Sequence, residues 1–300
     1  MNHSNHTKGF LYAALGSLSW GISGVCSQSL FMHYQLEASW LTAVRMVCSG
    51  ILLLLITLPK DKAHVFRIWT KPKDVIQLLA FALLGLLMCQ YTFLCAIRYS
   101  NSATATVLQS LNVILMAVIM AIRNRKRMGS RQLFAVFLAL VGTFLIAAGG
   151  NPANMNLSGA GLIFGLLAAI GVITYTLLSR PVVAVWGNLM VTGWGMLIGG
   201  LTLFLAIKAW QLPSGLDATA WLLVAAIVLI GTALGFSIFL EGVKLIGPVK
   251  ATLIGCLEPA SATALSALFL GTRFSLPELS GFCFIILTVF LSVTGAEKQT

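Results

Sequence analysis

Glu258 is a carboxylate in the middle of an apolar stretch, and Pro259 follows it directly. The stretch Pro248–Leu270 is about 23 residues long, enough for a helix to cross a hydrocarbon core of about 30 Å. A charge at the bilayer centre costs at least about 3 kcal/mol, so Glu258 needs either a function or local partners. In the functional interpretation it is a titratable group that exchanges protons with a cavity. In the structural interpretation it bonds backbone amides or hydroxyls near a kink at Pro259.

Arg45 is the second deep charge, about two turns into the apolar stretch Ser39–Leu58. A guanidinium there can bind a substrate carboxylate in bidentate geometry. It can equally pair with Glu258 or bond the carbonyls at a helix end, and the sequence leaves these alternatives open. The rough counterpart of Arg45 in the second half of the chain is Trp194, so any repeat symmetry is broken at this point.

A group of polar and aromatic residues is the third candidate for a site. Thr106, Gln109 and Ser110 share one helix face at the spacing i, i+3, i+4, and Asn112 follows them. Interhelical hydrogen bonds, worth about 0.6 kcal/mol each in membranes, explain any one of these residues. As a set they are better explained as the lining of a cavity. The full set of candidates is Trp20, Ser23, Arg45, Gln90, Thr106, Gln109, Asn112, Tyr175 and Trp194, with Glu258 and Pro259 as the coupling group or structural kink.

Other chemistries find little support in the chain. The six cysteines lie in apolar stretches without metal-ligand spacing, and the four histidines lie at the N-terminus or in loops, so we expect no metal and no cofactor. Gly21-Ile22-Ser23-Gly24 has the form of an intramembrane serine-protease motif. A serine nucleophile needs a base such as histidine, which no apolar stretch contains, so we do not expect an enzyme. No nucleotide-binding loop is present either.

The elements that must position these residues are membrane-spanning helices. Of the 300 residues, 58% are hydrophobic and only 9% are charged, against about 25% charged in a soluble domain. Apolar stretches fill nearly the whole length, which predicts an all-α polytopic membrane protein. The ten expected spans are Gly9–Leu30, Ser39–Leu58, Val75–Ile97, Ser102–Ile122, Gln132–Gly149, Ser158–Ser179, Gly187–Ala209, Thr219–Leu240, Pro248–Leu270 and Leu276–Gly295.

The distribution of basic residues predicts the orientation. The net charge is +11, yet the Lys and Arg residues gather in short loops on the side that holds the N-terminus. Only Arg98, Lys208 and Arg273 fall in loops on the other side. The positive-inside rule therefore places both termini in the cytoplasm, and the lipid bilayer, not nucleic acid, is the expected partner.

The chain also divides into two halves around the polar stretch 151–156. A shift of 146 residues aligns Phe93-Leu94 with Phe239-Leu240 and Ala105-Thr106 with Ala251-Thr252 without a gap. Five spans in each half is an odd number, so a repeat must be inverted in the membrane, which is a common plan of secondary transporters. We therefore expect two five-helix units, residues 1–150 and 151–300.

The chain resembles the drug/metabolite transporter superfamily, in particular its EamA-like members with ten spans. The resemblance is carried by Leu245-Ile246-Gly247-Pro248-Val249-Lys250-Ala251-Thr252, Leu257-Glu258-Pro259 and Leu268-Phe269-Leu270-Gly271, with Trp20-Gly21 and Arg45 in the first half. The chain departs from the family pattern at Val113, where a proline is common, and at Arg125-Lys126 and Gly271-Thr272, where Gly-Glu is common. The resemblance implies a secondary transporter, often an exporter of amino acids or related metabolites. Because the Glu-Pro pair is shared by members with different substrates, it favours the structural interpretation of Glu258.

The expected protein is thus an all-α polytopic membrane protein with ten transmembrane helices arranged as two inverted five-helix repeats. We expect it to move small metabolites, with amino acids as the leading class and export as the direction, across the plasma membrane by alternating access. Protons are the expected coupling ion, and the protein is expected to be a monomer or a homodimer. The alternatives are an exporter of multiple drugs or cationic compounds, and a membrane scaffold or lipid-handling protein without transport.

Overall fold

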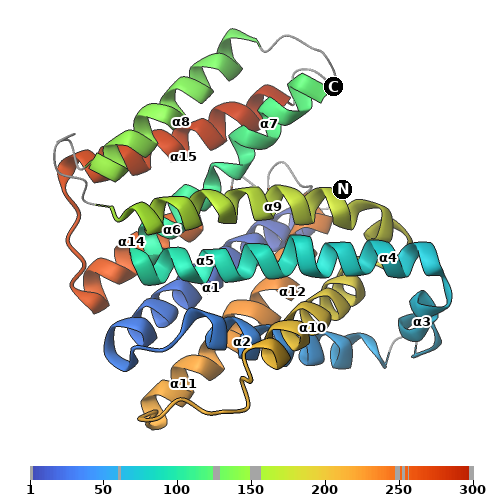
Figure 1. The fold of residues 1–300 in the computed structure, drawn as a ribbon. Coiled ribbons are helices and arrows are strands. Elements are labelled where there is room, and N and C mark those ends of the chain that lie inside the picture. The colour runs from blue at the N-terminus through green and yellow to red at the C-terminus, as the bar shows by residue number, and fades with distance from the viewer. Residues whose placement is uncertain are drawn as a thin grey trace.

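The fold is known from a computed structural model, which describes residues 3–59, 62–123, 129–148, 157–246, 251, 254–255 and 257–296. These residues form helices joined by short connections, and none of them lies in a strand (Figure 1). The helices are α1 His3–Tyr34, α2 Ala38–Thr57, α3 Lys62–Arg67, η1 Ile68–Thr70, α4 Pro72–Ala80, η2 Phe81–Leu87, α5 Met88–Tyr99, α6 Ser102–Ser110, α7 Asn112–Arg123 and α8 Ser130–Ala148. The second half contains α9 Gly159–Trp186, α10 Asn188–Ala206, α11 Ala218–Ala226, η3 Ile227–Leu234, α12 Gly235–Ile246, α14 Leu257–Leu270 and α15 Leu276–Ala296.

The helices agree with the predicted class of polytopic membrane protein. Among the described residues, six helices are long and apolar enough to cross a bilayer: Thr7–Tyr34, Ala38–Thr57, Pro72–Tyr99, Gly159–Trp186, Asn188–Ala206 and Ala218–Val243. Shorter apolar helices cover Ser102–Met116, Leu133–Ile146, Leu257–Leu270 and Leu276–Thr288, where further spans were expected. Residues 247–250, 252–253 and 256 of the expected ninth span, and the stretch 151–156 between the halves, lie outside the described residues.

Two of the long helices contain a π-helical segment at equivalent positions. Helix Pro72–Tyr99 passes through η2, which begins at Phe81, and helix Ala218–Ile246 passes through η3, which begins at Ile227. These two starting positions are separated by the same 146-residue shift that aligns the halves in the sequence. In η3 the Thr232 hydroxyl also donates to the Ile227 carbonyl at 3.0 Å, five residues back.

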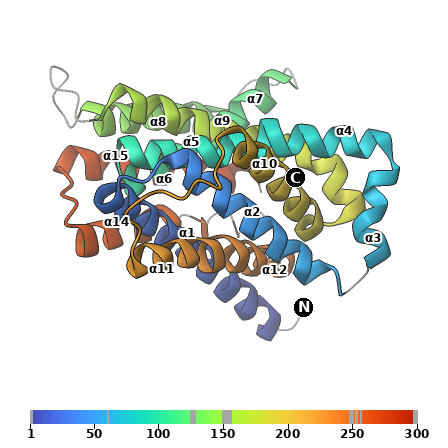
Figure 2. The same ribbon diagram turned by 60° about the horizontal axis from the view of Figure 1, so that its bottom comes forward.

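Helices from the two halves pack against each other in pairs. Figures 1 and 2 show α2 beside α10, α5 beside α9, and α1 beside α12, while α8 and α15 form a separate pair at one side. Gly50 lets the backbones of α2 and α10 approach, because a Cβ added there would lie 2.6 Å from the Leu197 nitrogen. Gly142 and Gly281 do the same for α8 and α15, since each added Cβ would meet the carbonyl oxygen of the other glycine. Small residues at crossings are how membrane helices gain close packing without a hydrophobic driving force.

One end of the molecule, the left-hand side of Figure 1, is joined by several contacts between connecting segments. We call it the Glu37 end; it holds residues 35–37, 100–101, 207–217 and 271–275. Arg98 forms an ion pair with Glu37, and the guanidinium beside it lowers the pKa of that carboxyl. The Trp40 indole donates to the Ala209 carbonyl at 3.0 Å. The Arg98–Glu37 pair joins two segments of the first half, and the Trp40–Ala209 bond joins the two halves.

Between the Glu37 end and the middle of the molecule, a buried glutamine joins three helices. The Gln28 Oε1 accepts from the Ser102 backbone nitrogen and the Ser102 hydroxyl, both at 2.9 Å, and from the Ser266 hydroxyl at 3.2 Å. Its amide nitrogen donates to the Thr272 hydroxyl at 3.1 Å, and the two serine hydroxyls are 2.7 Å apart. Ser102 begins α6, so Gln28 satisfies one of the backbone N–H groups that a helix start leaves without a partner. We call these four residues the Gln28 hub.

The opposite end, here the Asp74 end, is fastened by aromatic residues. The Trp186 indole, at the end of α9, donates to Asp74 at 2.9 Å, and the Lys71 ammonium lies 5.2 Å from the centre of the Trp186 ring. The Trp194 indole of α10 donates to the Val65 carbonyl at 3.0 Å. The short helices α3 and η1 are thereby held against α9 and α10.

Asp217 caps the start of α11 and gives a prediction on stability. Its Oδ1 accepts from the Ala220 backbone nitrogen at 2.8 Å and from the Tyr34 hydroxyl at 2.7 Å, and these bonds lower its pKa. A lowered pKa stabilises the fold above the ordinary aspartate pKa, and this stabilisation is lost as the pH falls through the lowered value. We expect Asp217→Asn to lower the unfolding temperature at neutral pH, and the difference from wild type to narrow as the pH falls below the ordinary aspartate pKa of about 4.

The Asp217 prediction is checked by thermal unfolding of purified protein in detergent across the pH range. Tyr34→Phe removes only one of the two donors to Asp217, so its effect is expected to be smaller and to have the same pH dependence. A difference between wild type and Asp217→Asn that does not narrow as the pH falls below the ordinary aspartate pKa would contradict the assignment.

Candidate functional site: a central polar cavity

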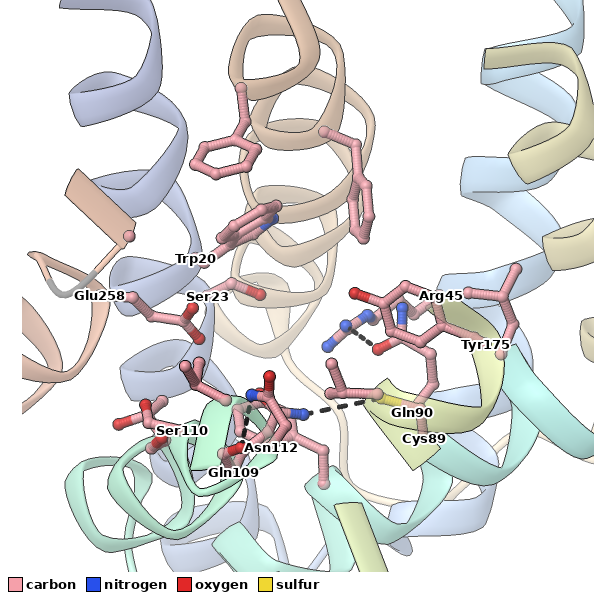
Figure 3. A pocket seen from close by; sticks show the side chains of 18 residues that line it. Trp20, Ser23, Arg45, Cys89, Gln90, Gln109, Ser110, Asn112, Tyr175 and Glu258 are labelled. Atoms are coloured by element: carbon pink, nitrogen blue, oxygen red, sulfur yellow. Dashed lines mark hydrogen bonds between the residues drawn. The ribbon is translucent and has the colours of Figure 1, made fainter. Parts of the chain in front are cut away.

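A cavity of about 260 Å³ lies among helices of both halves (Figure 3). Its volume is close to the lower limit of roughly 300 Å³ for small-molecule sites, so it suits a small ligand. The residues that line it are Trp20, Ser23, Arg45, Leu86, Cys89, Gln90, Phe93, Thr106, Gln109, Ser110, Asn112, Val113, Val172, Tyr175, Phe236, Phe239, Gly255 and Glu258. They come from α1, α2, η2, α5, α6, α7, α9, α12, α14 and the segment just before α14.

Arg45 reaches the cavity from α2 and is held by a glutamine of α5. The side chain is only 7% exposed, and its Nη2 donates to the Gln90 Oε1. Its Nε has no hydrogen-bond partner in the described part of the chain. The described residues contain no ion pair between Arg45 and Glu258, so of the three roles expected for Arg45, pairing with Glu258 is not the one adopted here. The guanidinium is thus a buried charge whose hydrogen bonds are incompletely used.

Glu258 lies in the first turn of α14, and Figure 3 places it across the cavity from Arg45. No hydrogen bond to its carboxylate is found among the described residues, whereas its backbone carbonyl accepts from the Ser261 hydroxyl at 2.9 Å. Pro259 is buried but does not line the cavity, and its missing N–H is harmless because it too stands in the first turn of α14. The local partners that the structural interpretation of Glu258 requires are therefore absent from the described residues.

Trp20 and Ser23 bring α1 to the cavity. The Trp20 ring packs against Phe239 at 4.7 Å and Phe236 at 5.2 Å between ring centres. The Trp20 Nε1 and the Ser23 Oγ are both buried, and neither has a hydrogen-bond partner in the part of the chain that the structure describes. Gly231 in η3 makes room for this arrangement, because a Cβ added there would lie 2.2 Å from the Ser23 Cβ.

The polar face expected on the fourth span meets the cavity where α6 ends and α7 begins. The Gln109 amide donates to the Cys89 sulfur at 3.6 Å, and the Asn112 amide donates to the Gln109 carbonyl at 2.7 Å (Figure 3). The hydroxyls of Thr106 and Ser110 instead donate to carbonyls of their own helix. All four side chains thus donate to protein acceptors, and the amide oxygens of Gln109 and Asn112, for which no donor is found among the described residues, are the groups available to a ligand on this side.

Most of the residues chosen from the sequence meet in this one cavity. Trp20, Ser23, Arg45, Gln90, Thr106, Gln109, Asn112, Tyr175 and Glu258 all line it. Trp194 does not, because its ring packs against Phe66 and Trp69 at the Asp74 end, with centres 5.9 and 5.1 Å apart. Trp194 was expected as the rough counterpart of Arg45, three residues beyond the position to which the 146-residue shift carries Arg45, but its indole N–H has a backbone partner away from the cavity.

Eight lining residues were not among the candidates chosen from the sequence, namely Leu86, Cys89, Phe93, Val113, Val172, Phe236, Phe239 and Gly255. A signal was present for five of them. Leu86, Cys89, Gln90 and Phe93 follow the helical spacing i, i+3, i+4, i+7, so the choice of Gln90 implies its neighbours on the same face. The 146-residue shift carries Gln90 and Phe93 to Phe236 and Phe239.

An all-helical membrane protein whose helices enclose a polar cavity has the architecture of a membrane transporter. A model of the EamA-like transporter family matches residues 7–148 and 159–294, so nearly the whole chain is covered in two stretches. The chain belongs to the EamA-like transporter family, and it is a membrane transporter.

Individual relatives agree with this family. The chain is 36% identical over 293 residues to a protein of Salmonella typhimurium described as an uncharacterized inner membrane transporter, YicL, with 97% of each chain covered. It is 31% identical over 188 residues to the uncharacterized transporter YcbK of Bacillus subtilis, with 60% of this chain and 58% of YcbK covered. A solved crystal structure of a protein shares the fold, with a TM-score of 0.64 at 16% identity and coverage of 100% of this chain and 99% of the other.

Proposed function

We propose that the protein is a secondary transporter that moves small metabolites, with amino acids or related compounds as the leading class, by alternating access. The observation that carries this proposal is the polar cavity itself. It lies well inside the helices, it is lined by both halves of the chain, and it contains two buried charges that no ion pair joins within the described residues. Binding sites between repeated halves are the general plan of secondary transporters.

The packing of the helices supports two inverted five-helix repeats, residues 1–150 and 151–300. If α1 corresponds to α9 and α5 to α12, the contact of α1 with α12 has its equivalent in the contact of α9 with α5. The contact of α1 with α14 likewise has its equivalent in that of α9 with α6. If α2 corresponds to α10 and α8 to α15, each of these helices packs against its own counterpart in the other half. An odd number of spans in each half then makes the repeats antiparallel in the membrane.

The expected setting of the protein follows from its charge pattern. The basic loops place both termini in the cytoplasm and the Glu37 end outside, in a plasma membrane, with export as the direction of transport. The partners are the lipid bilayer, the transported molecule and protons, and the assembly is a monomer or a homodimer. We assign the protein no cofactor, no nucleic-acid partner and no catalytic activity.

Glu258 is the group to which we assign proton coupling. A carboxyl in a membrane cavity, without a hydrogen-bond partner among the described residues, can take up and release a proton as the cavity opens to either side. The same carboxylate, together with the Trp20 ring, supports the second candidate function, export of cationic compounds. Arg45 in the same cavity opposes a cation. A scaffold or lipid-handling protein gives no reason for either charge.

The experiment that tests transport is flux of radiolabelled amino acids in proteoliposomes, with and without a pH gradient. We expect the gradient to accelerate flux through the wild-type protein, and Glu258→Gln to abolish that acceleration. Glu241→Gln is the matched control, because it makes the same chemical change at an exposed position outside the cavity, near the end of α12.

The outcomes separate the alternatives. Flux that does not depend on the pH gradient and is unchanged in Glu258→Gln would contradict the role of Glu258 in proton coupling but would support transport. Flux of organic cations without flux of amino acids supports the second candidate function. If purified, folded protein moves no small solute of either kind, the transport proposal fails.

A further inference from the structure

The buried polar atoms without partners all lie in one place. In the described part of the chain, the buried side-chain nitrogen and oxygen atoms that lack a hydrogen-bond partner are the Trp20 Nε1, the Ser23 Oγ and the Arg45 Nε. All three residues line the central cavity. Native proteins leave very few buried polar groups unpaired, and each such group calls for an explanation such as a bound molecule. Ser23 is 5% exposed and Arg45 is 7% exposed, so bulk water does not satisfy them.

The chemistry of these atoms specifies the missing partner. An indole N–H and a guanidinium N–H can only donate, and a serine hydroxyl can donate as well as accept. The Gln90 Oε1, an acceptor that faces the cavity, is already engaged by Arg45. The other acceptors of the lining, among them the Glu258 carboxylate, form no hydrogen bond with these donors within the described residues. The donors are therefore available to acceptor atoms of a ligand, which would replace cavity water, and a guanidinium binds a carboxylate more strongly than a neutral acceptor.

We propose that the cavity is a site for a small zwitterion, whose carboxylate is bound by Arg45 and whose ammonium group faces Glu258. This inference rests on the proposed function and adds the orientation of the ligand and the residue that binds each of its charges. Arg45 and Glu258 lie across the cavity from each other without an ion pair among the described residues, so each charge is available to a ligand (Figure 3). An α-amino acid carries these two opposite charges within a size that suits a cavity of about 260 Å³.

Gln90 is the positioning residue of this site. By accepting from the Arg45 Nη2, it restrains the guanidinium and leaves the Nε–H without a protein partner. A restrained guanidinium loses less conformational entropy when a carboxylate binds. Loss of Gln90 should therefore weaken the carboxylate contact without removing the charge.

Other ligand classes fit the same atoms less well. A cation without a carboxylate leaves the Arg45 Nε unpaired and places a second positive charge beside the guanidinium. An apolar compound leaves both charges and all three partnerless atoms unsatisfied. An anion without an ammonium group leaves Glu258 facing a second negative charge.

The experiment measures binding at equilibrium, independently of transport. Thermal stabilisation of purified wild-type protein is recorded with the twenty amino acids, and the strongest binder is compared with two analogues of the same skeleton. Its carboxamide keeps the ammonium group but not the carboxylate, and its deaminated acid keeps the carboxylate only. We expect each analogue to bind about tenfold or more weakly than the amino acid.

Two variants then assign the charges to the two ends of the ligand. Arg45→Gln is expected to weaken binding of the amino acid about tenfold or more and to leave binding of the carboxamide unchanged. Glu258→Gln is expected to weaken binding of the amino acid and to leave binding of the deaminated acid unchanged. If Arg45→Gln does not fold, Gln90→Leu is used, and it should weaken the amino acid and the deaminated acid but not the carboxamide. A Gln77→Leu variant, which loses a glutamine bond to the Leu178 carbonyl away from the cavity, is the control.

A carboxamide that binds as tightly as its amino acid would overturn the proposal, as would an equal loss for all three ligands in Arg45→Gln. Failure of all twenty amino acids to stabilise the protein would overturn it as well. Because binding is measured without flux, a protein that binds zwitterions but does not carry them would refute the transport function and leave this site standing.

Discussion

Replacing Gln28 by leucine is expected to raise the rate at which a membrane-impermeant thiol reagent reaches Cys89 from the Glu37 end by about tenfold. Gln28 stands about 7 Å along α1 from Ser23 in the cavity, at 1.5 Å per residue, so the Gln28 hub lies between the cavity and the Glu37 end. Leucine fills a similar volume but cannot bond Ser102, Ser266 or Thr272. The four lost bonds are worth about 0.6 kcal/mol each in a membrane, but the Ser102 and Ser266 hydroxyls, 2.7 Å apart, can still bond each other. A net loss of about 1.4 kcal/mol then shifts a closed–open equilibrium by about a factor of ten.

Cys89 is a native reporter for this measurement because it lines the cavity. The background protein carries alanine at the other five cysteines, which are Cys26, Cys48, Cys95, Cys256 and Cys283. Intact cells are treated with a charged thiosulfonate from outside, and inverted vesicles provide the opposite side. Gln77→Leu is the matched control, since it removes a glutamine bond of 2.8 Å within the packed pair α4 and α9.

A milder variant keeps the Gln28 prediction testable if leucine impairs folding. Ser266→Ala removes a single donor from the hub and is expected to give a smaller increase in the same direction. Equal labelling of Cys89 in wild type, Gln28→Leu and Ser266→Ala would show that the hub does not restrict entry from the Glu37 end.

Gly50→Ala is expected to lower the free energy of unfolding by about 1–3 kcal/mol, and Gly50→Leu to abolish the folded protein. At Gly50 an added Cβ would lie 2.6 Å from the Leu197 nitrogen, 2.9 Å from its Cα and 3.0 Å from the Gly193 carbonyl oxygen. These neighbours are backbone atoms of α10, so no side chain can move aside to relieve the overlap. The two helices would have to separate.

Thermal unfolding and size-exclusion profiles of detergent-purified variants measure the Gly50 effect. Gly159→Ala is the control, because nothing lies within 4 Å of a Cβ added there and it also stands in a membrane helix, at the start of α9. If Gly50→Ala unfolds at the same temperature as Gly159→Ala, the close approach of α2 and α10 does not contribute to stability.

The sequence predicted the helices well because the bilayer imposes one rule on every span. A backbone that crosses hydrocarbon must satisfy its own hydrogen bonds, so apolar stretches of sufficient length become helices. The same rule predicted where a site would lie. Polar residues such as Gln90 and Gln109 are expensive in a span unless they face other helices or a cavity, and both face the cavity.

The sequence did not predict which polar residues of the helices line the cavity and which form hydrogen bonds between helices elsewhere. Trp194 and Gln28 both lie in apolar helices, yet the first fastens the Asp74 end and the second joins α1, α6 and α14. Their partners are the Val65 carbonyl and the side chain of Ser266, which lie 129 and 238 residues away in the chain. Composition and helical spacing carry no information on contacts between residues so far apart in the chain. Which residues meet is determined by the packing of the helices.

The two π-helical segments have a consequence for the shape of the cavity wall. A π turn uses one more residue than an α turn, and one residue turns a helix by about 100°, so such an insertion reorients every side chain beyond it. Beyond η2 stand Gln90 and Phe93, and beyond η3 stand Phe236 and Phe239, and all four line the cavity. The 146-residue shift carries Arg45 to Val191 and Glu258 to Asn112, so neither charge has a charged counterpart. The backbone of the wall is thus alike in the two halves, whereas its charge is not.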